Sequence, residues 1–528
     1  MQVFKFHRSS LSQVSKQHLN LVYRQEAYLP FINHTFSFEN FDRQILEKEK
    51  NYQLESREIL VEALLKQHEE LSGFNELKAK IESLRDPDTF TITTGHQLSL
   101  FTGPLYFVVK ILHVIKLCKQ LKGKYPENNF VPVYWMASED HDFEEIQKMQ
   151  LFSKEFKWNS DQEGPVGRFN LEGFDEVKAQ VKEMFSNPDA EILELLDAYS
   201  GNNLTEATRN LNHELFKKYG LVIVDGDDRQ LKKIFSPIIK KELLEEFSYQ
   251  EVIATNDKLV NEGVKLQVKP REINLFYILD GVRKRIVKKE NNFLVEGLAT
   301  FSEDEILQEL TDFPERFSPN VILRPLYQEF ILPNLAYIGG SGEISYWLQL
   351  KQVFDAVDCT FPLIAVRNSV LWIDPVTAKK KAKIDLLLEN IFKTKDQLKK
   401  DYVEKNSNGE LDFRSVEKAS EKLIDSLDEL ILNVDGSMQG FAKSEETRIL
   451  KQIENIKSKL IKISKSKHSV AMNNIDQIMD KLFPNDNLQE REVNFFSFCP
   501  DGNYKKQLNK LYLALDPEEK DLLIIREI

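Results

Sequence analysis

The sequence predicts an α/β fold with a parallel β-sheet core, a small β-rich insertion and a long α-helical coiled-coil domain. Three observations support this prediction. Short apolar runs alternate with helical stretches, two strand-like runs flank an Asp-Gly pair at residues 280–281, and a heptad repeat of apolar residues begins near residue 449. The chain has 528 residues, 41% of them hydrophobic, which is enough for several folded units with cores.

Five short runs of apolar and β-branched residues have the pattern of parallel strands that are buried on both faces. They cover residues 89–94, 130–136, 221–225, 335–338 and 362–366. Helical stretches separate them, and Gly103-Pro104 begins a helix that we expect to reach about Leu121, because proline is tolerated in a first turn. Residues 1–85 also read as helical, and periodicity alone does not order the strands.

The insertion is predicted from residues 273–279 and 282–287, which flank Asp280-Gly281, a strong signal for a two-residue hairpin. Residues 293–295 add a possible third strand. The resulting domains are residues 1–254 (N-terminal helices and the first part of the core), 255–320 (insertion), 321–375 (second part of the core), 376–483 (coiled coil) and 484–528 (return to the core).

Apolar residues at heptad spacing predict the coiled coil, which could form an arm, a dimer interface or both. The seam comprises Ile449, Ile453, Ile456, Leu460, Ile463 and Val470, with Lys467 and Asn474 as polar interruptions. An antiparallel partner helix is expected from Val416, Ala419, Leu423, Leu430 and Val434, and a further helix from Ile384, Leu387, Ile391 and Leu398.

Charge and cysteine content narrow the class of protein. The formal net charge of −13 argues against nucleic-acid or anionic-membrane binding, while leaving room for a local basic pocket. Cys118, Cys359 and Cys499 are far apart and form no CxxC pair, which is typical of a reducing cytoplasm. The N-terminus lacks an apolar signal segment, and Lys110 and Lys116 interrupt the most apolar helix. We therefore expect a cytoplasmic protein.

The first candidate site is TTGHQLSLFTGP, residues 93–104, a strand-to-helix turn with two glycines. Backbone N–H groups at such a turn can face an anion such as a phosphate, and His96 and Gln97 would lie at the carboxyl end of the strand, where open α/β sheets bind ligands. The structural alternative is that Gly95 and Gly103 only shape turns while His96 caps a loop.

The second is SEDHDFEE, residues 138–145, which concentrates acids around one histidine after a strand. Glu139, Asp140, His141 and Asp142 could bind a divalent metal, orient a substrate amine or serve as acid and base. The alternative is a capped helix start.

The third is IGGSGE, residues 338–343, another glycine-rich turn, which does not match the full dinucleotide fingerprint. Arg324 upstream of it could hold a carboxylate or phosphate, or could form a structural ion pair. We expect Arg283, Lys284 and Arg285 to be exposed and Cys118 to belong to the core.

Two segments resemble the H-x-G-H and K-M-S-K-S signatures of class I synthetases: TTGH and residues 462–466. Because Ile463 lies on the heptad seam of a helix, and the synthetase loop must be flexible, we interpret the second match as coincidence.

Four long motifs, in this order and spacing, resemble the BshC family of bacillithiol biosynthesis: TTGHQLSLFTGPLYFVVK, PVYWMASEDHDFEEI, RPLYQEFILPNLAYIGGSGEISYW and NFFSFCPDG. The resemblance covers essentially the whole chain. It implies a Rossmann-like core, a helical coiled coil that makes a homodimer, and a ligase that adds L-cysteine to glucosaminyl-malate by an amide bond in the last step of the pathway.

The resemblance also implies which residues line the cleft. It gives Glu139, Asp140, His141 and Asp142 as catalytic candidates, and Gly95, Gln97, Thr102, Gly103, Gly342 and Glu343 as substrate- or nucleotide-binding candidates. The motifs themselves, apart from the resemblance, add His96, Arg324, Gly340 and Ser341 to the binding candidates. Amide formation in water requires an activated carboxylate, so ATP and Mg²⁺ are expected, with His141 as a base for the attacking amine. Two alternatives stay open: a metal-dependent hydrolase using the acid and histidine cluster, and a non-catalytic coiled-coil scaffold that binds a metabolite.

Overall fold

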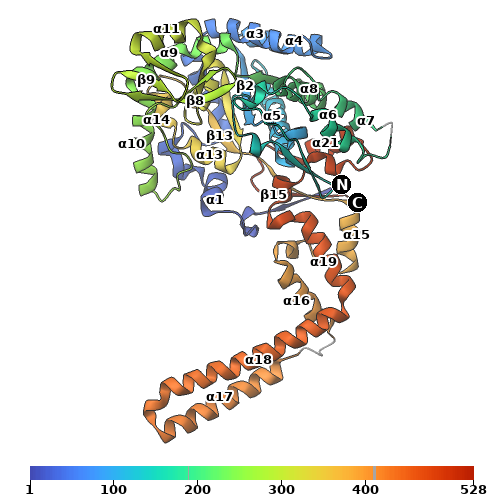
Figure 1. The fold of residues 1–528 in the computed structure, drawn as a ribbon. Helices are drawn as coiled ribbons and strands as arrows, with labels where there is room; N and C mark the ends of the chain where they lie inside the picture. Colours follow the sequence, from blue (N-terminus) through green and yellow to red (C-terminus); the bar gives the residue numbers. More distant parts are fainter. Residues whose placement is uncertain (188–189, 408–411, 528) are drawn as a thin grey trace. The chain divides into compact units, whose positions relative to one another are not determined.

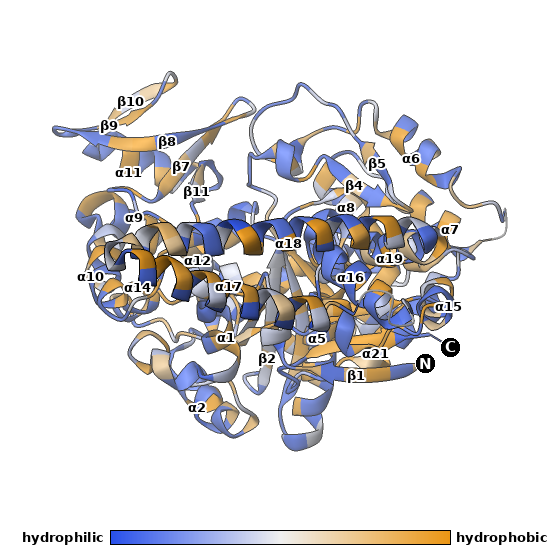
Figure 2. Ribbon diagram, turned by 90° about the horizontal axis from the view of Figure 1, so that it is seen from below, coloured by the Kyte–Doolittle hydropathy of each residue, from blue (hydrophilic) through white to orange (hydrophobic). Residues whose placement is uncertain are grey.

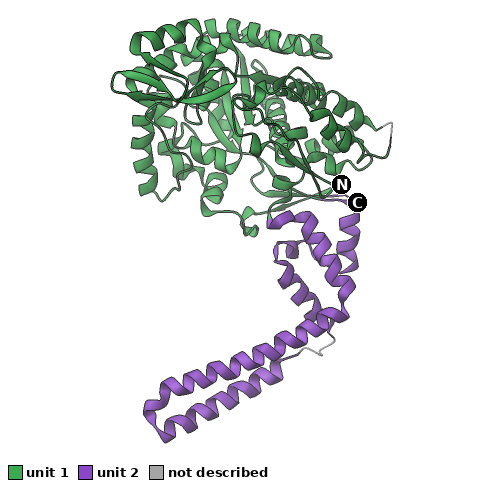
Figure 3. Ribbon diagram, in the orientation of Figure 1, with its two compact units in different colours: residues 1–372, 487–525 green, residues 373–486, 526–528 purple. Residues whose placement is uncertain are grey.

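The computed structural model describes residues 1–187, 190–407 and 412–527. The chain divides into two compact units (Figure 3). The first comprises residues 1–372 and 487–525, and the second comprises residues 373–486 with the C-terminal residues from 526.

The first unit is built on a five-stranded parallel sheet (Figure 1). Its strands are β2 (Thr89–His96), β3 (Asn129–Met136), β6 (Val222–Asp225), β12 (Asn334–Gly339) and β13 (Leu363–Val366), in the order β13-β12-β2-β3-β6. All five strands predicted from the sequence are thereby confirmed. The first strand of this sheet, β2, is central. The next two, β3 and β6, are added on one side of it, and β12 and β13 are added on the other, so the strand order reverses between β2 and β12. In open α/β sheets ligands bind beyond the carboxyl ends of the strands at this point.

Helices cover both faces of the sheet, as buried parallel strands require. Side chains alternate along β3, so Val133 and Trp135 pack with the helices α3 (Glu55–His68), α9 (Arg229–Glu245) and α12 (Leu323–Ile331). Tyr134 and Met136 point the other way, toward helices α5 (Leu105–Lys124), α8 (Leu204–Phe216) and α21 (Tyr504–Ala514). The start of α5 agrees with the helix expected after Pro104.

The β-rich insertion is a five-stranded sheet in the order β10-β9-β8-β7-β11. Its strands are β7 (Leu275–Leu279), β8 (Val282–Lys289), β9 (Asn292–Val295), β10 (Ala299–Ser302) and β11 (Phe317–Pro319). The predicted hairpin is confirmed: Asp280 and Gly281 both have positive φ, +50° and +77°, as the tight turn between twisted strands requires.

The N-terminal region differs from its prediction. Gln2–Phe6 forms strand β1, which joins β15 (Leu522–Arg526) and β14 (Ser369–Ile373) in a three-stranded sheet in the order β1-β15-β14. The prediction of a wholly helical segment was therefore wrong for these residues, because an edge strand of five residues is too short to show its period beside the helices that follow. Helices then extend from α1 (Lys16–Tyr23) through α2 (Phe41–Asn51) and α3 to α4 (Phe74–Glu82).

The second unit contains helices α15 (Pro375–Lys383), α16 (Lys395–Asn406), α17 (Arg414–Val434), α18 (Gln439–Lys467) and α19 (Ser469–Leu482). The single helix expected through Ile384 and Leu398 is interrupted, since α15 ends at Lys383 and α16 begins at Lys395. Residues 462–466 lie inside helix α18, which agrees with the coincidental interpretation of the K-M-S-K-S match.

The predicted heptad seam is only partly used inside the chain. Ile449 and Ile453 are half-buried, whereas Ile456, Leu460 and Ile463 are 59%, 42% and 52% exposed. Other residues take the buried positions: Ser420 and Ile424 on α17, and Ala442, Ile461 and Ser464 on α18. Apolar residues recur along α17 and α18 (Figure 2), and several of them are exposed. Among the described residues, no helix combines the length and apolar character needed to cross a bilayer.

A glycine in the first unit supports the loop that follows β3. Gly167 donates its N–H to the Ser138 carbonyl, and a Cβ at Gly167 would lie 2.8 Å from that same oxygen. We expect Gly167→Ala to destabilise the fold by about 1–3 kcal/mol, because backbone atoms cannot move aside as a flexible side chain can. Gly123→Ala is the control: it lies in α5 with no atom within 4 Å of the added methyl group and should stabilise the protein by about 0.5–1 kcal/mol. Thermal unfolding that shows equal melting temperatures for both variants would contradict the packing described.

Candidate functional site

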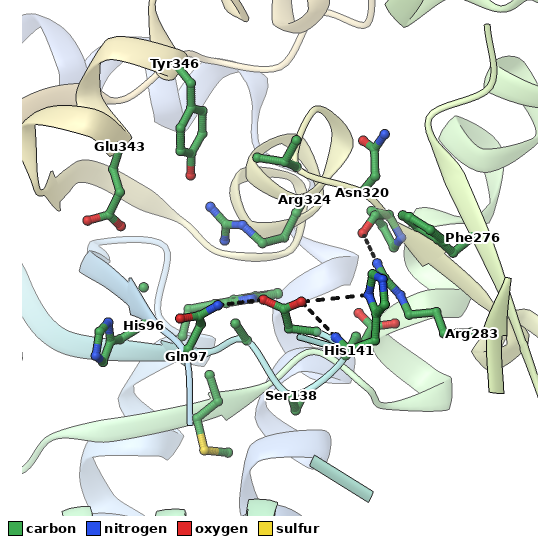
Figure 4. Close-up of a pocket in the computed structure, with 18 of the residues that line it drawn as sticks. His96, Gln97, Ser138, His141, Phe276, Arg283, Asn320, Arg324, Glu343 and Tyr346 are labelled. Carbon is green, nitrogen blue, oxygen red and sulfur yellow. Dashed lines mark hydrogen bonds and ion pairs between the residues drawn. The ribbon is translucent and has the colours of Figure 1, made fainter. Parts of the chain in front are cut away.

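A cavity of about 640 Å³ opens at the carboxyl ends of β2, β3 and β12, facing the β-rich insertion. Its volume and position suit a small-molecule site. The loop after β3, the insertion and helix α12 contribute most of its polar side chains, which converge from three directions (Figure 4). Eight of the predicted site residues line it: Gly95, His96, Gln97, Glu139, Asp140, His141, Arg324 and Glu343.

One wall of the cavity is acidic. The amide of Gln97, just after β2, donates to Asp140 Oδ2 at 2.9 Å and to Glu145 Oε2 at 2.6 Å, so one side chain gathers two carboxylates. Asp140 Oδ1 accepts the backbone N–H groups of His141 at 2.7 Å and Asp142 at 3.3 Å. This loop geometry fixes the Asp140 carboxylate beside that of Glu145, where a substrate ammonium can approach both.

Glu139 on the same loop points away from solvent. Its side chain is 13% exposed and pairs with the ammonium of Lys232, which is fully buried in α9 and also donates to the Phe317 carbonyl at 2.7 Å. Burial raises the pKa of Glu139, as does the nearby Asp227, and the Lys232 charge opposes that rise. Lys232 thus ties the loop after β3 to strand β11 of the insertion.

The imidazole of His141 contacts the insertion directly. Arg283 on β8 donates from Nη1 to His141 Nδ1 at 3.0 Å, and its guanidinium lies 3.9 Å from the centre of the Phe276 ring (Figure 4). Partial burial lowers the pKa of His141, and the positive charge of Arg283 lowers it further, while Asp140 acts in the opposite direction. His141 is therefore held neutral more strongly than an ordinary histidine.

The floor of the cavity spans the point where the strand order reverses. Lys110 on α5, 1% exposed, donates to the Gly95 carbonyl at 2.6 Å and to both oxygens of Glu343 at 3.0 and 2.7 Å. Glu343 on α13 (Ser341–Trp347) also accepts from the Tyr337 hydroxyl and the Gly340 N–H. Burial alone would raise the pKa of Glu343, but Lys110 and these hydrogen bonds hold it below its ordinary value. Glu343 is a fixed negative charge.

Two buried nitrogen atoms beside the cavity have no hydrogen-bond partner among the described residues: Arg324 Nη2 and His96 Nε2. Arg324 donates from Nη1 to Gln328 at 3.0 Å, and the Tyr346 hydroxyl is a further polar neighbour on the other side of its guanidinium (Figure 4). Burial, with the charge of Lys110, lowers the pKa of His96 to about 3, so this ring is neutral. A buried donor without a partner is costly, which makes Arg324 the side chain best placed to bind an anionic ligand group.

Sequence reasoning missed the basic side of the cavity. Arg283 and Arg285 line it together with Lys269 and Arg271. The expectation that these side chains are exposed is confirmed for Lys284 and Arg285 but was wrong for Arg283, which is half-buried. The signal was present, because residues two apart on a strand share a face, and Arg283 and Arg285 are such a pair. Lys110 was also missed: a lone lysine in an apolar helix needs a buried partner.

Six predicted residues do not line the cavity: Thr102, Gly103, Asp142, Gly340, Ser341 and Gly342. Thr102 and Gly103 have positive φ and shape the turn before α5, where Asn494 donates to the Gly103 carbonyl at 2.7 Å. Gly340 acts through its hydrogen bond to Glu343, and Gly342 is exposed. Direct substrate contact by these six residues stays a prediction.

The hydrolase alternative required His96 and His141 to converge on a metal. His96 instead stacks on Phe107, with 4.8 Å between ring centroids, while His141 bonds to Arg283. Within the described ranges, no three His, Cys, Asp or Glu side chains form a group that could hold a metal ion.

Family models match nearly the entire chain. The N-terminal Rossmann-like domain of bacillithiol biosynthesis BshC matches residues 4–368, and the C-terminal coiled-coil domain of BshC matches residues 370–527. The chain belongs to the BshC family. Both the Rossmann-like core and the coiled coil expected from the sequence are thus confirmed.

Curated BshC relatives align over almost their full lengths. Proteins from Flavobacterium johnsoniae, Christiangramia forsetii and Cytophaga hutchinsonii, each named "Putative cysteine ligase BshC", are 46%, 42% and 40% identical over 93%, 92% and 96% of this chain and 94%, 92% and 95% of their own. A solved structure described as a "putative arginyl tRNA synthetase" from Campylobacter jejuni is 11% identical and covers 84% of this chain and 98% of its own. Its TM-score of 0.21 is too low to carry an argument.

Removing the ammonium group of Lys110 from this BshC protein should reverse the direction in which the pKa of Glu343 is shifted. We expect Lys110→Met to cost about 1–3 kcal/mol at neutral pH, because it leaves the carboxylate of Glu343, whose side chain is 29% exposed, without its positive partner. In the native protein the pKa of Glu343 lies below 4.5, so its contribution to stability is present above that pH and is lost on acidification. In the variant, burial raises that pKa instead, so the penalty disappears as the pH falls.

The measurement is the difference in melting temperature between the variant and the native protein, from about pH 7 down to about pH 4. We expect this difference in melting temperature to become smaller as the pH falls. Lys119→Met, an exposed position on the same helix, is the control and should change little at any pH. A gap for Lys110→Met that stays constant with pH would refute the assignment.

Proposed function

We propose that this protein joins L-cysteine to glucosaminyl-malate through an amide bond, the last step of bacillithiol biosynthesis. One observation carries the proposal: the acidic pair Asp140 and Glu145 lines the same cavity as the guanidinium groups of Arg324 and Arg283. The carboxylates can bind the positively charged amine of one substrate, and the guanidinium groups can bind the negatively charged carboxylate of the other. The names of the relatives support the same conclusion.

The reaction requires activation of the cysteine carboxylate, and ATP is the proposed source. A carboxylate oxygen attacks a phosphorus atom of ATP, which releases either pyrophosphate or ADP. The glucosaminyl amine then attacks the activated carbonyl carbon: the C–N bond forms, the C–O bond to phosphate breaks, and the amine loses a proton. Arg324, a guanidinium that lines the cavity, is proposed to bind the negatively charged oxygens of this intermediate.

Mg²⁺ is proposed to arrive on the phosphates of ATP, which together with water supply most of its ligands in sites of this kind. The residues that the structure describes do not form a separate metal site, and Asp140 and Glu145 each accept a hydrogen bond from the Gln97 amide. No protein ligand is assigned to the ion. The acidic pair is proposed instead to bind the attacking amino group and orient it toward the carbonyl carbon.

The reaction itself is the test. Purified protein supplied with L-cysteine, glucosaminyl-malate and ATP should yield bacillithiol, detected by mass spectrometry, with release of AMP or ADP identifying the route of activation. Asp140→Asn should lower kcat/KM by about 100-fold, because it removes a charge and sets two amides against each other at Gln97. Glu144→Gln, an exposed change outside the cavity, is the matched control and should leave the rate unchanged. Absence of product with all three substrates would sink the proposal.

The coiled coil is proposed to form a homodimer. Val416, Leu423 and Leu430 on α17 are seven residues apart, so they form one row, and they are 46%, 51% and 61% exposed. Together with Ile456, Leu460 and Ile463 on α18 they leave an apolar surface of a kind that stable proteins usually cover. A second copy of the same hairpin would supply matching apolar rows.

Lysine substitution at both Ile456 and Leu460 should convert the dimer into a monomer, because two buried charges would face the partner's apolar row. Light scattering measures the mass directly. The control is Lys459→Glu, an exposed site between them, which should leave the dimer intact. A double variant that remains dimeric would place the interface elsewhere.

A cytoplasmic location is proposed on the basis of its thiols. Among the described residues, Cys118, Cys359 and Cys499 form no disulfide bond, as expected in a reducing compartment.

A further inference from the structure

The structure assigns His141 the role of a neutral hydrogen-bond donor, through Nε2–H, to an oxygen of the reacting acyl group, with Arg283 of the β-rich insertion as the positioning residue that fixes this tautomer. The inference rests on the proposed ligase reaction. It replaces the expectation that His141 is the base for the attacking amine.

The hydrogen bond between the two residues determines the tautomer. Arginine carries donors and no acceptor, so the contact of 3.0 Å from Arg283 Nη1 requires an unprotonated Nδ1 on His141. The proton of the neutral ring must then be on Nε2, because the bond made by one ring nitrogen sets the state of the other. His141 therefore presents an N–H, rather than a lone pair, at its remaining nitrogen.

Arg283 is itself held firmly in place. It donates from Nε to Ser318 Oγ at 3.0 Å and from Nη2 to the Pro319 carbonyl at 3.1 Å, and it stacks on Phe276. Three separate contacts on β7 and β11 thus leave Nη1 aimed at the imidazole (Figure 4). The insertion therefore fixes the His141 side chain, which belongs to the loop after β3.

The surrounding charges favour the neutral ring. His141 faces Asp140 and Asp142 on its own loop and Arg283 and Lys284 on β8. The two carboxylates alone would favour an imidazolium, but partial burial and the two cations outweigh them and lower the pKa of His141. Protonation at Nδ1 would also set an N–H against the Arg283 donor, so the Nε2–H form persists in the neutral range.

This arrangement suits the acyl oxygen better than the amine. Attack on the activated cysteine places negative charge on the carbonyl oxygen, and a fixed neutral donor stabilises that charge without any proton transfer. A ring with Nδ1 occupied and Nε2 protonated cannot take a proton from the amine. The amine's proton is instead released toward the acidic pair, Asp140 and Glu145, which gathers at Gln97.

Amide side chains provide a matched test, because glutamine carries an N–H₂ near the position of Nε2 and asparagine near that of Nδ1. His141→Gln should keep kcat/KM within about 10-fold of the native value, with the same dependence on pH. His141→Asn and His141→Ala should lose about 100-fold or more, as expected for removal of one oxyanion donor. Equal inactivity of the Gln and Asn variants, with loss of one limb of the pH profile, would instead identify a general base and overturn the inference.

The positioning role of Arg283 has its own readout. Arg283→Met frees Nδ1 and removes a positive charge, so the pKa of His141 should rise and a new acid limb should appear in the pH profile of kcat/KM. The double variant Arg283→Met/His141→Gln should lack that limb. A merely structural role for Arg283 would lower the rate equally at every pH.

Nitrogen-15 NMR of histidine-labelled protein tests the tautomer without any reaction, with His141→Gln identifying the resonance. The spectrum at neutral pH should show a protonated Nε2 and an unprotonated Nδ1. A protonated Nδ1, or an imidazolium, would refute the inference whether or not the protein is a ligase. If the spectrum is as expected but the protein makes no bacillithiol, the assigned tautomer is correct and the proposed ligase function is wrong.

Discussion

The buried ammonium of Lys110 is the contact on which the cavity depends. Parallel strands leave unpaired carbonyl groups at their carboxyl ends, and the reversal of strand order separates β2 from the loop after β12. Lys110 joins the two sides, because it binds the Gly95 carbonyl and the Glu343 carboxylate with one charged group. Burying a charge costs several kcal/mol, so its retention here is explained by the geometry that it imposes. Gly95 is part of the same constraint, since a Cβ there would lie 3.0 Å from the Tyr337 hydroxyl.

Lys232 performs the corresponding task on the other side. It is fully buried, and it connects Glu139 of the loop after β3 with the Phe317 carbonyl of the insertion. The two lysines therefore anchor opposite walls of one cavity, each through a carboxylate that the sequence identified and an ammonium that it did not. The acidic residues belong to motifs that are easy to recognise in the sequence. The lysine that pairs with each of them is a single residue in a distant helix. Only the folded chain shows which lysine pairs with which acid.

Sequence patterns show local features but not contacts between distant residues, and this explains which parts of the fold could be predicted. The five strands are short-range patterns, and all five were found, but their order depends on contacts between residues far apart, such as Asn334 with Thr91 and Thr93. For α18 the heptads identify an apolar face without naming its partner. Ile456 and Leu460 share a seam with Ile449, and yet inside the chain that seam does not stay buried. Periodicity specifies the face of an element, and the partner comes from tertiary or quaternary packing.

The basic wall resolves an apparent conflict between the protein and its proposed substrates. A chain with net charge −13 would repel malate carboxylates and nucleotide phosphates if its charges acted uniformly. At physiological ionic strength, however, exposed charges are screened beyond roughly 8 Å, whereas charges at a partly desolvated cavity act at full strength on a ligand in contact with them. Arg271, Arg283 and Arg285 come from the insertion or the segment leading into it, and Arg324 follows shortly after it. A small sheet added to a Rossmann-like core thus supplies the positive potential that the core's own acidic loop lacks, and through Arg283 it also sets the proton on His141.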